Sequence, residues 1–192
     1  MNIVLIGYRG TGKSVVGKIV SEHLQIKCIA MDARIVEKAG MSIPDIVENL
    51  GWTTFRDMES EVSRELAKLD NIIIDTGGGV IERPENIDVL QANSCIIWLK
   101  ASEDVIVSRI KGGIERPSLT GEKSFTEEVA EILERRTPKY TSAAQYEIDT
   151  EQLTPEQVAG RILKIWKRAI HFAGVAKSSR AASNSEQFLC TL

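Results

Sequence analysis

Gly7-Tyr8-Arg9-Gly10-Thr11-Gly12-Lys13-Ser14 fills every fixed position of the pattern G-x-x-x-x-G-K-[ST]. The apolar run at residues 3–6 precedes this stretch and is typical of a buried parallel strand. Apolar residues recur at helical spacing directly after it, at Val15, Val16, Ile19, Val20 and Leu24. Glycine-rich turns also join strands to helices without any ligand. The complete pattern between a strand and a helix nevertheless favours a binding site for the phosphates of a nucleotide.

The chemistry of this phosphate loop, residues 7–14, is mostly that of its backbone. Gly7, Gly10 and Gly12 leave room for several N–H groups to converge on phosphate oxygens at the start of a helix. Lys13 adds a positive charge that can follow the β- and γ-phosphates. The Ser14 hydroxyl can enter the coordination shell of Mg²⁺. The sequence therefore predicts a nucleotide bound together with one magnesium ion.

Composition restricts the class of protein. The chain has 192 residues, which fits one domain, and its 27% charged and 43% hydrophobic residues are ordinary for a soluble globular protein. No apolar run approaches the roughly 20 residues of a membrane span. The formal charge of −3 argues against general affinity for nucleic acid. The three scattered cysteines suggest neither a disulfide framework nor a zinc site. The N-terminus lacks the pattern of a signal peptide, so we expect a cytoplasmic protein.

Short apolar runs alternate with helical stretches, which predicts an α/β fold. We expect a doubly wound, five-stranded parallel sheet with helices on both faces. Its strands are predicted at residues 3–6, 27–31, 72–75, 95–99 and 146–148. Helices are predicted at residues 13–24, 42–50, 57–69, 103–111 and 126–136, and a final helix follows a capping box formed by Thr154 and Gln157.

The remaining segments set the expected boundaries. Residues 112–123 contain Gly-Gly, Arg-Pro and Thr-Gly, which predicts a mobile lid over a ligand. We expect residues 1–171 to form one kinase domain. Residues 172–192 are rich in Ser and Ala without clear periodicity, and a disordered tail is expected there. A monomer is the default expectation.

Further landmarks follow the phosphate loop in a specific order. They are Asp32 ahead of Gly40-Met41-Ser42-Ile43, Phe55-Arg56-Asp57-Met58-Glu59, Thr76-Gly77-Gly78-Gly79, Arg116-Pro117, and Arg136-Thr137-Pro138-Lys139-Tyr140. In this order and spacing, from residue 3 to about residue 165, the chain resembles the shikimate kinase family. The resemblance implies transfer of the γ-phosphoryl group of ATP to the 3-hydroxyl of shikimate, with Mg²⁺, to give shikimate 3-phosphate and ADP. This is a step of chorismate and aromatic amino-acid biosynthesis.

The resemblance also assigns the acceptor. Shikimate is a small polyhydroxylated carboxylate, and guanidinium groups suit its carboxylate. By resemblance Arg56 and Arg136 would hold that carboxylate, with Glu59 orienting Arg56 one helical turn away. The substrate site would be lined by Gly77, Gly78 and Gly79, with Gly78 in direct contact with the substrate. Each assignment has a structural alternative. Arg56 and Glu59 could form an exposed ion pair that contributes only tenths of a kcal/mol. Arg136 could merely favour the negative end of its helix, and the three glycines could form a flexible turn.

The remaining roles also follow from the resemblance. Asp32 would orient the acceptor hydroxyl and could take its proton, although a lone Asp ahead of a helix is more often a cap. Arg116, on the lid, would neutralise charge on the transferring phosphoryl group. Arg109 would pack against adenine, opposite the stretch 150–155, although an exposed helix arginine looks similar. The ATP-binding residues are then Gly10, Thr11, Gly12, Lys13, Ser14, Val15, Arg109, Arg116 and Gln152, and the catalytic ones are Lys13, Asp32 and Arg116.

The chain departs from the family pattern at two positions. The family usually has Asp-x-Asp at the end of its second strand, where this chain has Ala30-Met31-Asp32. The absent carboxylate normally helps to hold Mg²⁺ through water. Asp75 ends the third predicted strand, where an acid commonly supports the metal in phosphate-loop enzymes, and we hypothesise that it takes over this outer-shell role. Ser118 follows Arg116-Pro117 where leucines are more usual, which would alter the closure of the lid.

Two other classes of function stay open on the sequence alone. A gluconate-type or nucleotide kinase would share the phosphate loop and lid. A nucleotide-binding regulatory module without catalysis would explain the changes at Ala30 and Ser118. The intact Lys13, Ser14 and Asp32 and the arginines at 56, 116 and 136 favour the shikimate kinase interpretation.

Overall fold

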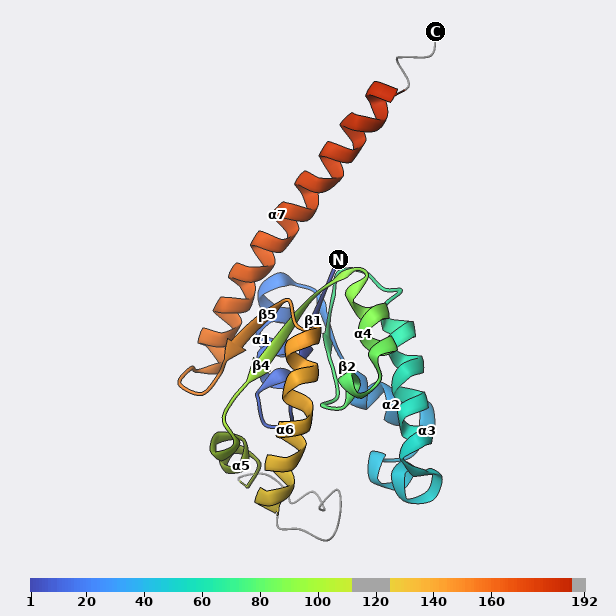
Figure 1. The fold of residues 1–192 in the computed structure, drawn as a ribbon, viewed down its shortest axis with the longest axis vertical. Helices are drawn as coiled ribbons and strands as arrows, with labels where there is room; N and C mark the ends of the chain where they lie inside the picture. The colour runs from blue at the N-terminus through green and yellow to red at the C-terminus, as the bar shows by residue number, and fades with distance from the viewer. Residues whose placement is uncertain (112–124, 188–192) are drawn as a thin grey trace.

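One parallel sheet organises the chain. The computed structural model describes residues 1–111 and 125–187. Five strands, β1 (Asn2–Ile6), β2 (Lys27–Ala30), β3 (Ile72–Asp75), β4 (Ser94–Lys100) and β5 (Tyr146–Asp149), form a sheet in the order β2-β3-β1-β4-β5 (Figure 1). Every pairing is parallel, and in the centre Ile3 lies opposite Ile73 on one side and Cys95 on the other. The predicted fold class is confirmed.

Helices cover both faces of the sheet. Alternate residues of the central strands point to opposite faces, so Ile3 and Leu5 pack on α1 (Lys13–Leu24) and α7 (Pro155–Gln187), while Val4 and Ile6 lie on the other side. That second face is covered by α2 (Met31–Ala39), α3 (Ile43–Leu66), α4 (Pro84–Gln91) and α6 (Phe125–Ala143). A smaller apolar cluster joins α5 (Glu103–Lys111) to α6 near the phosphate loop.

The helices differ from the predicted ones in several places. Helices α2 and α4 were not predicted, and the two helices expected at 42–50 and 57–69 adjoin within α3. Gly51 forms the kink between them, at φ 82° and ψ 163°. Glycine suits this position because residues with a side chain do not easily adopt that conformation. Helix α6 continues past the expected residue 136 and through Pro138, because Tyr140 is fully buried and anchors the additional turns in the core.

The last helix differs most from the prediction. It begins as expected, since Thr154 and Gln157 each accept a hydrogen bond from the other's backbone N–H, at 3.3 and 2.9 Å. It then continues to Gln187 and projects away from the body of the molecule (Figure 1). A disordered tail was expected from residue 172, but residues 172–187 are helical. This segment contains no proline and several alanines, so nothing in it forces the helix to stop.

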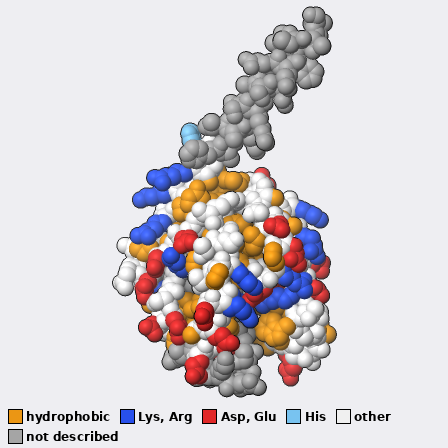
Figure 2. All heavy atoms as spheres, viewed as in Figure 1, with side chains coloured by type: hydrophobic (Ala, Val, Ile, Leu, Met, Phe, Trp, Pro, Cys, Tyr) orange, Lys and Arg blue, Asp and Glu red, His pale blue; other side chains and the backbone are white. Residues whose placement is uncertain are grey.

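Lys and Arg side chains are interspersed with Asp and Glu side chains on the face shown in Figure 2, with no continuous basic field there. Across residues 1–111 and 125–187, no helix has the length and apolar character needed to cross a membrane.

The topology also fixes where ligands can meet the chain. The phosphate loop follows β1, Asp32 follows β2 and Gly77 follows β3, so all three lie at the carboxyl edge of one parallel sheet. In open parallel sheets this edge is where ligands bind.

Candidate active site

The phosphate loop has the backbone that its glycines allow. Gly7, Gly10 and Gly12 have φ values of 143°, 82° and 93°, which side chains disfavour. A Cβ at Gly7 would also clash with the carbonyl oxygen of Leu99. Substituting these glycines would therefore distort the loop at the N-terminus of α1, where backbone N–H groups are free for an anion.

Lys13 is folded back over this loop. Its Nζ donates hydrogen bonds to the carbonyl oxygens of Gly7 and Tyr8, at 2.8 and 3.0 Å. Burial lowers the pKa of Lys13, and the nearby carboxylates of Asp75 and Asp32 oppose that effect. The amine thus lies in a desolvated position, where an arriving phosphate would offer it a charged acceptor in place of two carbonyls.

Ser14 and Asp75 meet beside the loop. The Ser14 hydroxyl donates to Oδ2 of Asp75 at 2.6 Å, although the two residues are 61 positions apart. Asp75 is 6% exposed and pairs in register with Ala30 on the adjacent strand. The carboxylate therefore lies next to the position where the family pattern places its missing acid. A hydroxyl and a carboxylate supply the oxygen atoms that Mg²⁺ prefers.

The predicted acceptor residues also come together, around the triple glycine that follows β3. A Cβ at Gly77 would lie 2.7 Å from Oδ1 of Asp32 and 3.2 Å from Oε1 of Glu59. One at Gly79 would overlap the guanidinium of Arg56, and one at Gly78 would lie 3.7 Å from Nη1 of Arg136. Two guanidinium groups and two carboxylates therefore border a strip of backbone without side chains. We call these residues the acceptor site: Asp32, Arg56, Glu59, Gly77, Gly78, Gly79 and Arg136.

Glu59 is not part of an exposed ion pair. Its side chain is 1% exposed, and Oε2 accepts a 2.5 Å hydrogen bond from Nη1 of Arg56. Burial raises the pKa of Glu59, while the charge and hydrogen bond of Arg56 oppose the rise. Within the described part of the chain, Oε1 has no hydrogen-bond partner. This geometry rules out the alternative of a solvated surface pair and leaves one carboxylate oxygen facing the triple glycine.

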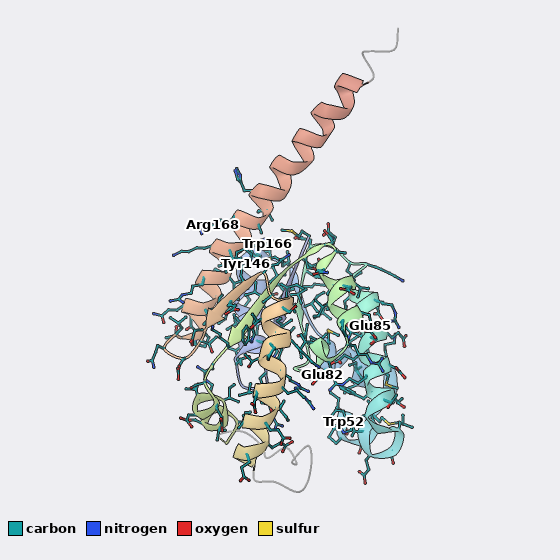
Figure 3. All side chains as sticks on the ribbon, in the orientation of Figure 1. Trp52, Glu82, Glu85, Tyr146, Trp166 and Arg168 are labelled. Carbon is teal, nitrogen blue, oxygen red and sulfur yellow. The ribbon has the colours of Figure 1, made fainter. Side chains whose placement is uncertain are left out.

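Aromatic rings fix Arg56 from the other side. Its guanidinium carbon lies 5.4 Å from the ring centre of Trp52 and 5.0 Å from that of Phe55. Trp52 is labelled on α3 in Figure 3 and directly follows the kink at Gly51. Such contacts favour a cation over the ring face. Neither ring was predicted to belong to the site, although the spacing of Trp52 and Phe55 from Arg56 on one helix was a usable signal.

Contacts from α6 complete the site. The Tyr140 hydroxyl donates to the carbonyl oxygen of Gly78 at 2.5 Å, and its ring stacks on Trp98. Arg136, whose side chain is 9% exposed, donates through Nε to Oε1 of Glu82 at 2.7 Å. These roles of Tyr140 and Glu82 were not predicted. No local pattern could have revealed them, because their partners are more than 50 residues away.

Arg109 lies at the other end of the phosphate loop. Its Nη1 and Nη2 donate to the hydroxyl and carbonyl oxygens of Thr150, at 2.9 and 2.8 Å. The structure thus brings Arg109 to the start of the stretch 150–155, as the adenine interpretation requires. Gln152 is exposed in this stretch, and Val15 is 56% exposed on the first turn of α1. The expected lid at 112–123, with Arg116 and Ser118, lies outside the described residues.

Known proteins match this chain over most of its length. A family model for shikimate kinase matches residues 9–167. The chain belongs to the shikimate kinase family. A curated shikimate kinase of Thermodesulfovibrio yellowstonii is 42% identical over 167 residues, which span 87% of this chain and 95% of the relative.

Solved structures agree with this membership. A shikimate kinase from Acinetobacter baumannii, solved in complex with shikimate, superposes with a TM-score of 0.81 at 30% identity, and the match covers 88% of this chain and 93% of that one. A gluconokinase from Sinorhizobium meliloti reaches a TM-score of only 0.53 at 17% identity, covering 90% and 96% of the two chains. The second likeness shows a common fold and no more.

Proposed function

We propose that this chain transfers the γ-phosphoryl group of ATP to the 3-hydroxyl of shikimate, giving shikimate 3-phosphate and ADP. Membership of the shikimate kinase family supports this activity, and ATP is the co-substrate. The single observation that carries the residue assignment is the convergence of Arg56 and Arg136 on the triple glycine, beside Asp32 and next to the phosphate loop. A buried guanidinium group at Arg136 and a partly buried one at Arg56 suit a small carboxylate.

The chemistry follows from positioning and charge. The phosphate loop would hold the phosphates through its backbone N–H groups, with Lys13 neutralising charge on the β- and γ-phosphates. Arg56 and Arg136 would bind the carboxylate, so that the acceptor hydroxyl lies beside Asp32. Asp32 accepts a hydrogen bond from that hydroxyl and orients the hydroxyl oxygen toward the γ-phosphorus. The new P–O bond forms as the bond to the β-phosphate oxygen breaks, and ADP leaves. The proton of the acceptor hydroxyl passes to the Asp32 carboxylate and from there to solvent.

The residues present fit one magnesium ion. Mg²⁺ would neutralise charge on the phosphates when bound. We assign Ser14 as the direct ligand and Asp75 as the outer-shell carboxylate, on the strength of the 2.6 Å contact between them. Arg116 remains assigned to the transferring phosphoryl group by resemblance, since it lies outside the described residues.

Asp75 gives the first prediction. In Asp75→Asn and Asp75→Ala, the Mg²⁺ concentration for half-maximal activity should rise about 10- to 100-fold, the usual range for loss of an outer-shell partner. Restoring Ala30→Asp in the Asp75→Ala background should reverse the rise, because positions 30 and 75 are paired neighbours in the sheet. A Mg²⁺ titration of ADP binding by calorimetry measures the same shift without turnover.

The matched control is Asp88→Asn, which removes an exposed carboxylate from α4. It should leave the Mg²⁺ requirement unchanged. An unchanged requirement in both Asp75 variants would remove this residue from the metal site.

The acceptor can be tested against the rival kinases. ADP release is followed with shikimate, gluconate or a nucleoside monophosphate offered alone at the same concentration. Turnover should depend on shikimate. Gluconate is the informative rival, because it also carries a carboxylate and the gluconokinase shares the fold. Tight ATP binding without turnover on any acceptor would instead favour a regulatory module.

A further inference from the structure

Glu82 holds a cluster of three cations next to the acceptor site. It ends the short helix η1 (Val80–Glu82), which directly follows the triple glycine. Its Oε1 accepts from Nε of Arg136 at 2.7 Å and from Nη2 of Arg135 at 3.0 Å, and its Oε2 accepts from Nζ of Lys139 at 2.5 Å. Burial acts to raise the pKa of Glu82, but these hydrogen bonds and charges outweigh burial and lower it to about 2. The carboxylate is therefore ionised at any pH suited to an assay.

The contact with Arg136 decides which way that guanidinium faces. Glu82 occupies Nε, while the Arg136 atom that lies within 3.7 Å of the Cβ position at Gly78 is Nη1. A guanidinium is planar and its donors are fixed relative to one another. Holding the Nε edge therefore leaves Nη1 directed at the triple glycine, where a substrate carboxylate can accept from it.

The neighbouring residue ties the same turn to the helix of the other arginine. Nη2 of Arg83 lies 2.7 Å from Oδ1 of Asp57, and its Nη1 donates to the Ser60 hydroxyl at 3.2 Å. Both partners are on α3, which carries Arg56. The turn after the triple glycine is thus bound to α6 through Glu82 and to α3 through Arg83. It links the two helices that present the carboxylate-binding arginines.

We propose that Glu82 is a positioning residue for acceptor recognition: it orients Arg136 and sets the spacing between the Arg136 and Arg56 guanidinium groups. This role rests on the proposed function, because it requires an acceptor carboxylate between those two groups. Glu82 does not touch the substrate. Its effect should appear only for acceptors that carry the negative charge.

The test compares Glu82→Gln and Glu82→Asp with the unmodified full chain, on shikimate and on its neutral primary amide. We expect the KM for shikimate to rise about tenfold or more in Glu82→Gln, consistent with losing one well-aligned charged contact, and to rise less in Glu82→Asp. The KM for ATP should stay within twofold. The activity on the amide should be nearly unchanged, so that the preference for the carboxylate falls.

Two controls separate the possible failures. Glu85→Gln removes an exposed carboxylate from the first turn of α4 and should leave kcat and both KM values unchanged. Glu82 and Glu85 are both labelled in Figure 3. If the unmodified chain does not phosphorylate shikimate, the proposed function fails before any variant is compared.

A KM for shikimate within twofold of the unmodified chain in Glu82→Gln would overturn the proposal. Equal losses on shikimate and its amide would also overturn it, because a merely structural role predicts that result. Should circular dichroism show that Glu82→Gln does not fold, Glu82→Asp decides: a loss confined to shikimate supports the proposal, and no loss or an equal loss on the amide overturns it.

Discussion

Lys13→Met is expected to lower kcat by about 10²- to 10³-fold, the usual loss when one preorganised positive donor to a transition state is removed. Lys13 is buried, and only two loop carbonyls accept from its Nζ in the described structure. A methionine of similar length fills the same space without the charge. Desolvation already acts against the charged amine, so the fold should tolerate the change. Steady-state kinetics and a thermal melt measure both effects.

Lys18→Met is the matched control, since it removes an exposed lysine from the same helix. It should change neither kcat nor the melting temperature appreciably. Lys13→Met with kcat within threefold of the unmodified chain would contradict the role assigned to this amine. A collapse of the melting temperature in Lys13→Met would show that Lys13 chiefly supports the loop.

Gly79→Ala should lower kcat/KM for shikimate by about 10- to 100-fold, with little change in the KM for ATP. The new Cβ would overlap the Arg56 guanidinium, which is the far end of a flexible side chain. The fold can therefore survive, but Arg56 must leave its place beside Glu59. Losing one or two charge-assisted hydrogen bonds to the substrate carboxylate accounts for the size of the effect.

Gly160→Ala is the control for adding a methyl group. Nothing lies within 4 Å of the position of its Cβ in α7, and alanine favours a helix more than glycine does. It should keep full activity and melt no earlier than the unmodified chain. A Gly79→Ala enzyme that keeps its kcat/KM for shikimate would show that Arg56 does not bind the acceptor from its observed position.

The sheet could be predicted from the sequence because each strand of a doubly covered parallel sheet is a nearly continuous apolar run. Residues 3–6 and 72–74 are such runs, and all are buried. The helical segments were harder to delimit. Gly51 permits a kink without any gap between two helices, and burial of Tyr140 extends α6 past Pro138. Both outcomes depend on tertiary packing that local periodicity does not encode.

The candidate site likewise contains residues that could be predicted from the sequence and residues that could not. Lys13 and Ser14 could be predicted from the phosphate-loop motif alone. Asp75 could be predicted to lie near them because it ends a strand of the same sheet, and its carboxylate accepts a hydrogen bond from Ser14. Glu82 carries no comparable signal. It is one acidic residue in a turn, and only its distance to Arg136 on α6 gives it a role.

The identity of the phosphorylated product tests the central claim most directly. The unmodified chain is incubated with ATP, Mg²⁺ and shikimate, and the product is examined by phosphorus–proton correlation NMR. We predict a monophosphate whose phosphorus couples to the proton on carbon 3, formed one-to-one with ADP. Absence of shikimate-dependent ADP, or a phosphorus coupled to the proton on carbon 4 or 5, would contradict the proposed reaction.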